Sequence, residues 1–139
     1  MFENILVAVD GSKHSDAAFD VAMDIAQKYG SQLFVLHVFS GGTGSRTLVS
    51  SSEEDDNRSI GQEILNSYEE TAKERGLQNV RMLLQEGDAA KRIMETASEI
   101  KCGLLLLGSR GRGGFKELLL GSVSHKVTSH ADCPVLIAK

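Results

Sequence analysis

Glycine residues in the last third of the chain form the pattern with the clearest chemical meaning. Gly108 and Gly111 have two residues between them, and the pair Gly121-Ser122 follows after nine more. Glycine after a strand lets backbone N–H groups approach a bulky anion, and the unpaired N–H groups at a helix start favour phosphate. The spacing predicts a phosphate-binding loop that leads into a helix, and a tight turn without a ligand is the alternative. Three cations would add positive charge nearby: Arg110, Arg112 and Lys116.

Better-known phosphate and nucleophile motifs are absent from the sequence. No Gly-Lys-Ser or Gly-Lys-Thr occurs in the glycine-rich stretch, which excludes a Walker A loop. The first apolar run is not followed by Gly-x-Gly-x-x-Gly, so the dinucleotide-binding fingerprint is absent as well. There is also no Gly-x-Ser-x-Gly elbow of the kind that hydrolases use. We therefore identify no catalytic residue from the sequence.

Short apolar runs alternate with amphipathic stretches along the chain. The runs predict buried strands over 4–9, 32–38, 79–85, 104–107 and 135–138. The amphipathic stretches predict helices over 15–29, 89–100 and 121–130, and a further helix whose stripe is Ile60, Ile64, Tyr68 and Ala72. Residues 39–53 are rich in serine, glycine and threonine and are expected to form a mobile loop. Strict alternation predicts one α/β domain over 1–139, with a doubly wound parallel sheet between two helix layers.

Asp10 follows the first predicted strand, and the glycine pattern follows the fourth. Ligands of such sheets bind outside the carboxyl ends of the strands, where the strand order reverses. If the first strand is central, this point lies between strands one and four. Asp10 is then a candidate ligand, and a cap for the following helix is its alternative role.

Composition limits the other possibilities. The chain has 139 residues, a net charge of -4 and no tryptophan, which argues against a nucleic-acid-binding surface. No apolar run approaches the roughly 20 residues of a membrane span, and we expect a cytoplasmic protein. Cys102 and Cys133 match no disulfide framework or metal spacing, so we expect small buried thiols. His37 is expected to be a core or strand-face histidine rather than a ligand, and the acidic run 53–56 a solvated helix start rather than a metal site.

The chain resembles the universal stress protein family. The nucleotide-binding signature of that family is Gly, two residues, Gly, nine residues, Gly, then Ser or Thr, which Gly108, Gly111 and Gly121-Ser122 meet. Val123-Ser124 follows, as in the ATP-binding branch of the family. Further similar segments are Val-Ala-Val-Asp10-Gly-Ser, Leu-His-Val38, Glu86-Gly87-Asp88-Ala and His130-Ala-Asp-Cys-Pro134-Val-Leu-Ile.

The resemblance implies a Rossmann-like fold of the adenine-nucleotide alpha-hydrolase type, with five strands in the order 3-2-1-4-5. It also implies a site for ATP, or for AMP or ADP, together with Mg or Mn. By similarity, Asp10 would contact the ribose or the nucleotide-bound metal, and the Val38 backbone would hold the adenine edge. The remaining expected contacts are Ala8, Leu107, Gly108, Arg110, Gly111, Gly121, Ser122, Val123 and Ser124.

The function implied by the resemblance is a nucleotide-responsive module of the stress response. It would act as a homodimer, joined through the apolar edge strand Val135 to Ala138, and through a protein partner that the sequence does not identify. A slow ATPase or self-phosphorylating protein is one alternative, for which we find no base. An interaction protein that binds no nucleotide is the other.

Overall fold

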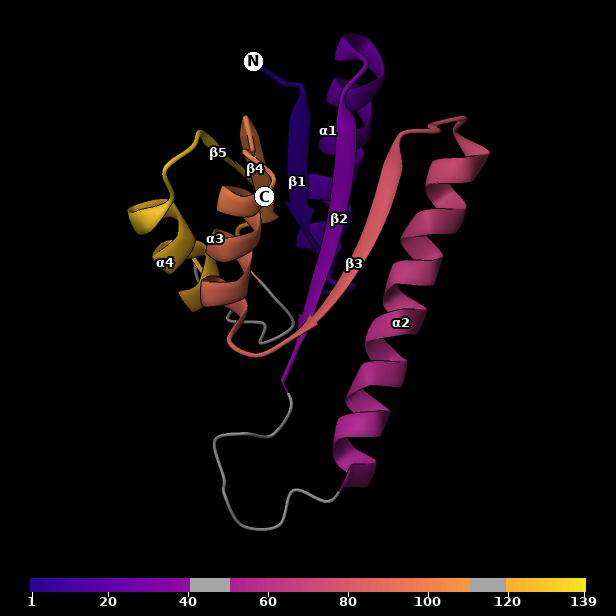
Figure 1. Cartoon of the computed structure of the whole chain (residues 1–139), viewed down its shortest axis with the longest axis vertical. Helices are drawn as coiled ribbons and strands as arrows, with labels where there is room; N and C mark the ends of the chain where they lie inside the picture. The colour runs from indigo at the N-terminus through magenta and orange to yellow at the C-terminus, as the bar shows by residue number, and fades with distance from the viewer. Residues whose placement is uncertain (41–50, 111–119) are drawn as a thin grey trace.

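Five parallel strands form one sheet at the centre of the molecule (Figure 1). The computed structural model describes residues 1–40, 51–110 and 120–139, with residues 51–55 described by their backbone alone. The strands are β1 (Asn4–Ala8), β2 (Gln32–Phe39), β3 (Val80–Glu86), β4 (Leu104–Gly108) and β5 (Val135–Ala138). They lie in the order β3-β2-β1-β4-β5, so the expected 3-2-1-4-5 order is confirmed.

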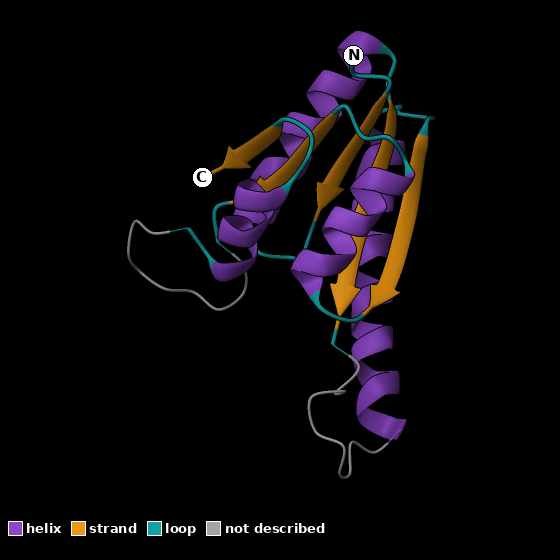
Figure 2. Ribbon diagram, turned by 60° about the vertical axis from the view of Figure 1, so that its left-hand side comes forward, coloured by secondary structure: helices purple, strands orange, loops and turns teal. Residues whose placement is uncertain are grey.

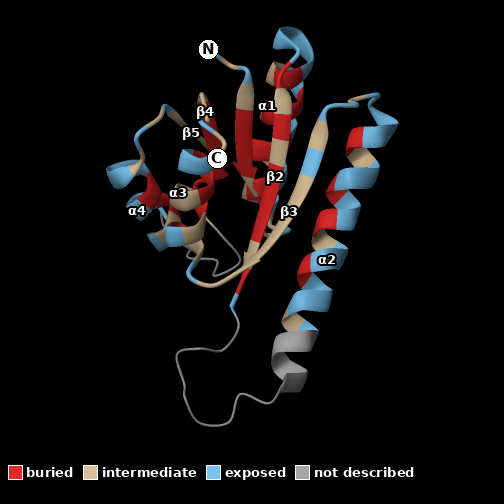
Figure 3. Cartoon of the chain, viewed as in Figure 1, coloured by how far each residue is buried: buried red, intermediate tan, exposed pale blue. Residues whose placement is uncertain are grey.

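Among the described residues, two helices cover each face of this sheet, which confirms the predicted three-layer α/β fold. The helices α1 (Lys13–Tyr29) and α2 (Ser51–Glu74) pack on one face, and α3 (Ala89–Glu99) and α4 (Ser122–His130) pack on the other. Within β1, Ile5 and Val7 belong to the core layer under α1 and α2, whereas Leu6 belongs to the layer under α3 and α4. Because both faces are covered, the strand is apolar from Ile5 to Ala8, and Figure 3 shows its middle buried.

Local signals place the ends of α1. The side chain of Ser12 accepts a hydrogen bond from Ser15 N and caps the helix start. Gly30 ends the helix in the left-handed conformation, with φ 65°, as its position after the apolar stripe predicts. Capping by Ser12 rather than Asp10 excludes the predicted alternative in which Asp10 serves only as the N-cap.

The loop predicted over 39–53 is shorter in the structure at both ends. Phe39 is the last residue of β2, where it pairs with Glu86 and is only 5% exposed. The helix α2 already begins at Ser51. The predicted loop was wrong at these residues because pairing with β3 extends β2, and because serine is common at helix starts. Residues 41–50 lie outside the described part of the chain.

The inward side of α2 also differs from the predicted stripe. Leu65, Tyr68 and Ala72 are buried, whereas Ile60 is 44% exposed, so the inward assignment of Ile60 was wrong. The neighbouring Gly61 faces the sheet instead, since a Cβ there would lie 2.8 Å from side-chain atoms of His37 and Leu84, and Ile60 lies to the side of this contact. Figure 2 shows that the first turns of α2 extend past the ends of the strands. In the described part of the chain, no helix is both long and apolar enough to cross a membrane.

Candidate functional site

The ends of β1 and β4 lie side by side at the point where the strand order reverses. The chain runs from β1 to β2 and β3 on one side, and then returns to β4 and β5 on the other (Figure 1). β1 pairs with β4 from Ile5 opposite Leu104 to Val7 opposite Leu106. The segments that follow these two strands, with Asp10 and Gly108, therefore start at the same edge of the sheet, as predicted.

Hydrogen bonds hold the Asp10 segment against the start of α1. Asp10 Oδ1 accepts from Ser12 N at 2.9 Å, and Asp10 N donates to Ser15 Oγ at 3.2 Å. Gly11 lies between them with φ 83°, a left-handed conformation that suits glycine. The half-buried carboxylate of Asp10 is thus fixed by its own loop at the switch point.

Gly108 makes a close approach to α1 that leaves no room for a side chain. A Cβ atom at Gly108 would lie 2.7 Å from the carbonyl carbon and the Cβ of His14, and 2.9 Å from Ser15 N. The next residue, Ser109, is buried, and its Oγ lies 3.3 Å from His14 Nδ1. The glycine at this strand end is therefore required by packing, in addition to any role toward a ligand.

Hydrogen bonds connect the start of α4 to the end of β4. Gly121 N donates to Ser109 O at 2.7 Å, and Ser124 Oγ donates to Gly108 O at 2.5 Å. Gly121 is the N-cap of α4 and offers no side-chain cap. These contacts place the N–H groups of the first turn of α4, which have no acceptor within the helix, near the end of β4. Such an N-terminus can bind an anion.

The first turn of α4 contains the other predicted residues of that helix. Ser122 is exposed, Val123 is half-buried, and the Ser124 hydroxyl is used by Gly108. Arg110 is half-buried at the end of the described segment after β4. Gly111, also a predicted site residue, lies outside the described residues, as do Arg112 and Lys116.

The backbone of Val38 faces the space beyond the end of β1. Alternate residues of a parallel strand direct their N–H and C=O groups to the same neighbour. Val9 N donates to Leu36 O, so Leu36 and Val38 face the β1 side, whereas Phe39 O accepts from Gly87 N on the β3 side. Because β1 ends at Ala8, the Val38 backbone groups lie past that strand.

The His37 side chain takes the place of the next backbone hydrogen bond between β1 and β2. Its Nδ1 lies 2.8 Å from Val9 O, the acceptor at which the next ladder bond would form. A carbonyl oxygen can only accept, so Nδ1 carries the hydrogen. The imidazole is only 7% exposed, which confirms the predicted core histidine.

Three apolar side chains that the resemblance assigns to the site lie on one face of the sheet. Ala8, Val38 and Leu107 all belong to the core layer under α3 and α4, and Val123 packs against the same layer. The structure thus brings the described candidate residues to one sheet edge. His14 and Ser109 also lie at this edge, but they are not among the residues predicted from the sequence. No local sequence pattern indicates that α1 crosses the end of β4.

A buried polar cluster links α2 to the Asp10 segment. The hydroxyl of Tyr68 donates to Asp16 Oδ1 and lies 2.9 Å from Ser15 Oγ, the atom that accepts from Asp10 N. The Tyr68 ring packs against Phe19 with centroids 4.8 Å apart. Burial raises the pKa of Tyr68 above its ordinary value, and the hydrogen bond to Asp16 raises it further.

We expect Tyr68→Phe to lower the free energy of unfolding by about 1–2 kcal/mol, because it leaves buried Ser15 with one partner fewer. The raised pKa adds a test at high pH. Wild-type stability that depends on neutral Tyr68 is complete below about pH 10, the pKa of an unfolded tyrosine, and decreases as the pH rises above it. Urea unfolding from pH 7 to 11 should therefore show the difference between the two proteins shrinking above pH 10. A constant difference would contradict this prediction.

The parallel order β3-β2-β1-β4-β5, with polar loops at the β1/β4 switch point, defines a Rossmann-like α/β protein. The model of the family described as "Universal stress protein family" matches residues 1–139, and the chain belongs to that family. The chain is 35% identical to the universal stress protein YxiE of Bacillus subtilis, with all of both chains covered.

Solved structures share this fold. The universal stress protein UspA from Lactobacillus plantarum has the same fold, with a TM-score of 0.89 at 24% identity, over 99% of this chain and 98% of that one. A universal stress protein solved in complex with cAMP superposes with a TM-score of 0.76 at 26% identity. The comparison covers 99% of this chain and 96% of that protein.

Proposed function

We propose that this universal stress protein binds ATP at the switch point and that the bound nucleotide changes its association with partners. The observation that carries the proposal is the joining of the α4 N-terminus to the end of β4, beside the Asp10 segment. A helix N-terminus at this position suits a phosphate chain. The related protein that was solved with cAMP supports an adenine nucleotide as the ligand.

Residues at this sheet edge would supply the contacts that such a ligand needs. The Val38 backbone, directed past the end of β1, would hold the adenine edge, while Ala8, Leu107 and Val123 provide apolar surface on the same side. The Asp10 carboxylate would contact the ribose or a divalent cation bound to the phosphates. The N–H groups of Ser122, Val123 and Ser124 would bind the phosphates, together with Gly108, Arg110 and Gly111.

Calorimetric titration with ATP and Mg²⁺ tests the proposal directly. We expect saturable binding in the micromolar to millimolar range. ADP, AMP and cAMP are then tested as competitors, and their affinities relative to ATP show how much the phosphate chain contributes to binding. Repeating the titration on Asp10→Ala, with and without Mg²⁺, separates a metal contact from a ribose contact, because only a metal contact depends on the ion. Absence of heat and of a thermal shift at millimolar ATP would refute nucleotide binding.

We further propose a homodimer joined at β5, which is an edge strand of the sheet. Leu105 N donates to Pro134 O and Ser109 N donates to Ala138 O, so even-numbered residues of β5 face β4. Val135 and Ile137 therefore direct their backbone groups to the open edge. Such an edge is usually paired or covered.

In sedimentation at micromolar concentration, we expect the wild type to be a dimer and Ile137→Pro to be a monomer. Proline removes an edge N–H but no β4 hydrogen bond. Leu136→Pro is the matched control, since it removes a bond to β4 and should lower the melting temperature instead. A monomeric wild type would exclude this dimer.

A further inference from the structure

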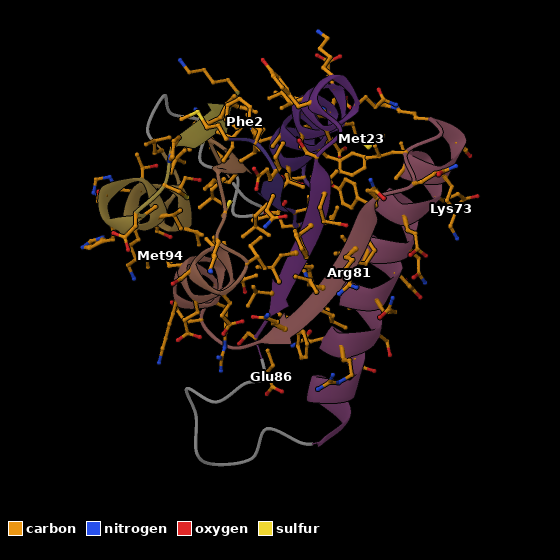
Figure 4. All side chains as sticks on the ribbon, turned by 45° about the horizontal axis from the view of Figure 1, so that its top comes forward. Phe2, Met23, Lys73, Arg81, Glu86 and Met94 are labelled. Atoms are coloured by element: carbon orange, nitrogen blue, oxygen red, sulfur yellow. The ribbon has the colours of Figure 1, made fainter. Side chains whose placement is uncertain are left out.

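A cavity with both cysteines in its wall lies at the opposite end of the sheet from the candidate site. Its volume is about 190 Å³, and it is bounded by α3, the C-terminal end of α4 and the segments that lead into β4 and β5. Its wall includes Met94, Lys101, Cys102, His130, Asp132 and Cys133. Figure 4 shows Met94 on α3. Because the strands are parallel, these entry segments are remote from the strand ends that hold Asp10 and Gly108.

The fold brings the two cysteines together although they are far apart in sequence. Cys102 follows Lys101, which has φ 54°, and Cys102 N donates to Ala97 O at 2.9 Å. Cys133 precedes β5, and the register of Leu105 opposite Val135 places it next to the segment that enters β4. Both side chains pack on the core layer under α3 and α4, and both are half-buried rather than fully buried as expected.

The two thiols differ in their surroundings. Cys102 Sγ donates to Leu104 O at 2.9 Å. Burial raises the pKa of Cys102 to about 12, and the charge of Cys133 and a hydrogen bond with its side chain also favour the protonated form. The Cys102 thiol therefore stays protonated at neutral pH. Lys101, His130 and Asp132 line the same cavity as Cys133.

We propose that Cys102 and Cys133 are a thiol pair that a hydroperoxide converts to an intramolecular disulfide. The Cys133 sulfur attacks one peroxide oxygen and the O–O bond breaks. With hydrogen peroxide, the leaving hydroxide takes up the proton that the thiol gives up, so the products are a sulfenic acid and water. The Cys102 sulfur then attacks the sulfenic sulfur, and the hydroxyl group leaves with the Cys102 proton as a second water. Two thiols are oxidised and one peroxide is reduced to two waters.

The sequence makes the experiment simple, because it contains only these two cysteines. The full chain is treated with hydrogen peroxide at neutral pH, quenched, alkylated with N-ethylmaleimide and weighed by mass spectrometry. We expect two labels before oxidation and none after it, a peptide pair cross-linked between Cys102 and Cys133, and both labels restored by dithiothreitol. ATP plays no part in this readout, so its outcome is independent of the proposed nucleotide site.

Single variants test the order of the steps. Cys102→Ser should accumulate sulfenic and sulfinic acid on Cys133, trapped by dimedone in its sulfenic form. Cys133→Ser should keep a free Cys102 thiol under the same treatment. Circular dichroism establishes that both variants are folded. Two labels retained by the wild type under peroxide that oxidises free glutathione, or covalent dimers on a non-reducing gel, would each overturn the proposal.

Discussion

Gly108→Ala is expected to lower the free energy of unfolding by about 1–3 kcal/mol, which is typical of overpacking in a well-packed interior. The added Cβ would lie 2.7 Å from the carbonyl carbon of His14 and 2.9 Å from Ser15 N. These are backbone atoms, so relief requires the first turn of α1 to move away from β4. That turn also holds the Asp10 segment through Ser15, and we expect ATP affinity to fall by about tenfold or more, equivalent to about 1.4 kcal/mol.

The measurements are urea unfolding at pH 7 and ATP titration at a temperature where the variant remains folded. Gly76→Ala is the matched control, because Gly76 has φ 77° and nothing within 4 Å of an added Cβ. It should cost about 1 kcal/mol of stability through backbone strain alone, and leave ATP affinity unchanged. Wild-type stability in Gly108→Ala would contradict the close approach to His14.

The double variant Gly121→Val with Ser122→Val is expected to abolish detectable ATP binding. The two branched side chains would occupy the space above the first N–H groups of α4, where the phosphates are proposed to bind. Gly121 has φ -61° and ψ 160°, a conformation that valine adopts readily, and Ser122 is exposed. The change in unfolding free energy should therefore stay within about 1 kcal/mol.

Ser129→Val is the control for this variant, since Ser129 is exposed in the last turn of the same helix. It adds the same side chain to α4 far from the proposed phosphates and should bind ATP like the wild type. Unchanged ATP affinity in the double variant would refute binding at the α4 N-terminus. An equal loss of ATP affinity in both variants would show instead that binding depends on the stability of α4 as a whole.

The order of elements could be predicted because each depends on neighbouring residues. The buried run at Leu104 to Leu107 becomes β4, and Gly30 ends α1, because periodicity and capping act within a few residues. The errors lie where tertiary contacts decide. Phe39 stays in β2 because β3 pairs with it, and Ile60 is exposed because the neighbouring Gly61 is the residue that faces the sheet.

The amino-acid sequence by itself determines a single α/β chain with strands and helices near their observed places, and a glycine spacing that points to phosphate. Only the tertiary structure decides which distant groups meet. His14 meets Gly108, His37 meets Val9 and Cys102 lies beside Cys133. The physical reason is that these contacts follow from strand order, register and helix crossing, and each of these results from many weak interactions over the whole chain. Helix caps and hydrophobic periodicity, in contrast, depend on a few adjacent residues.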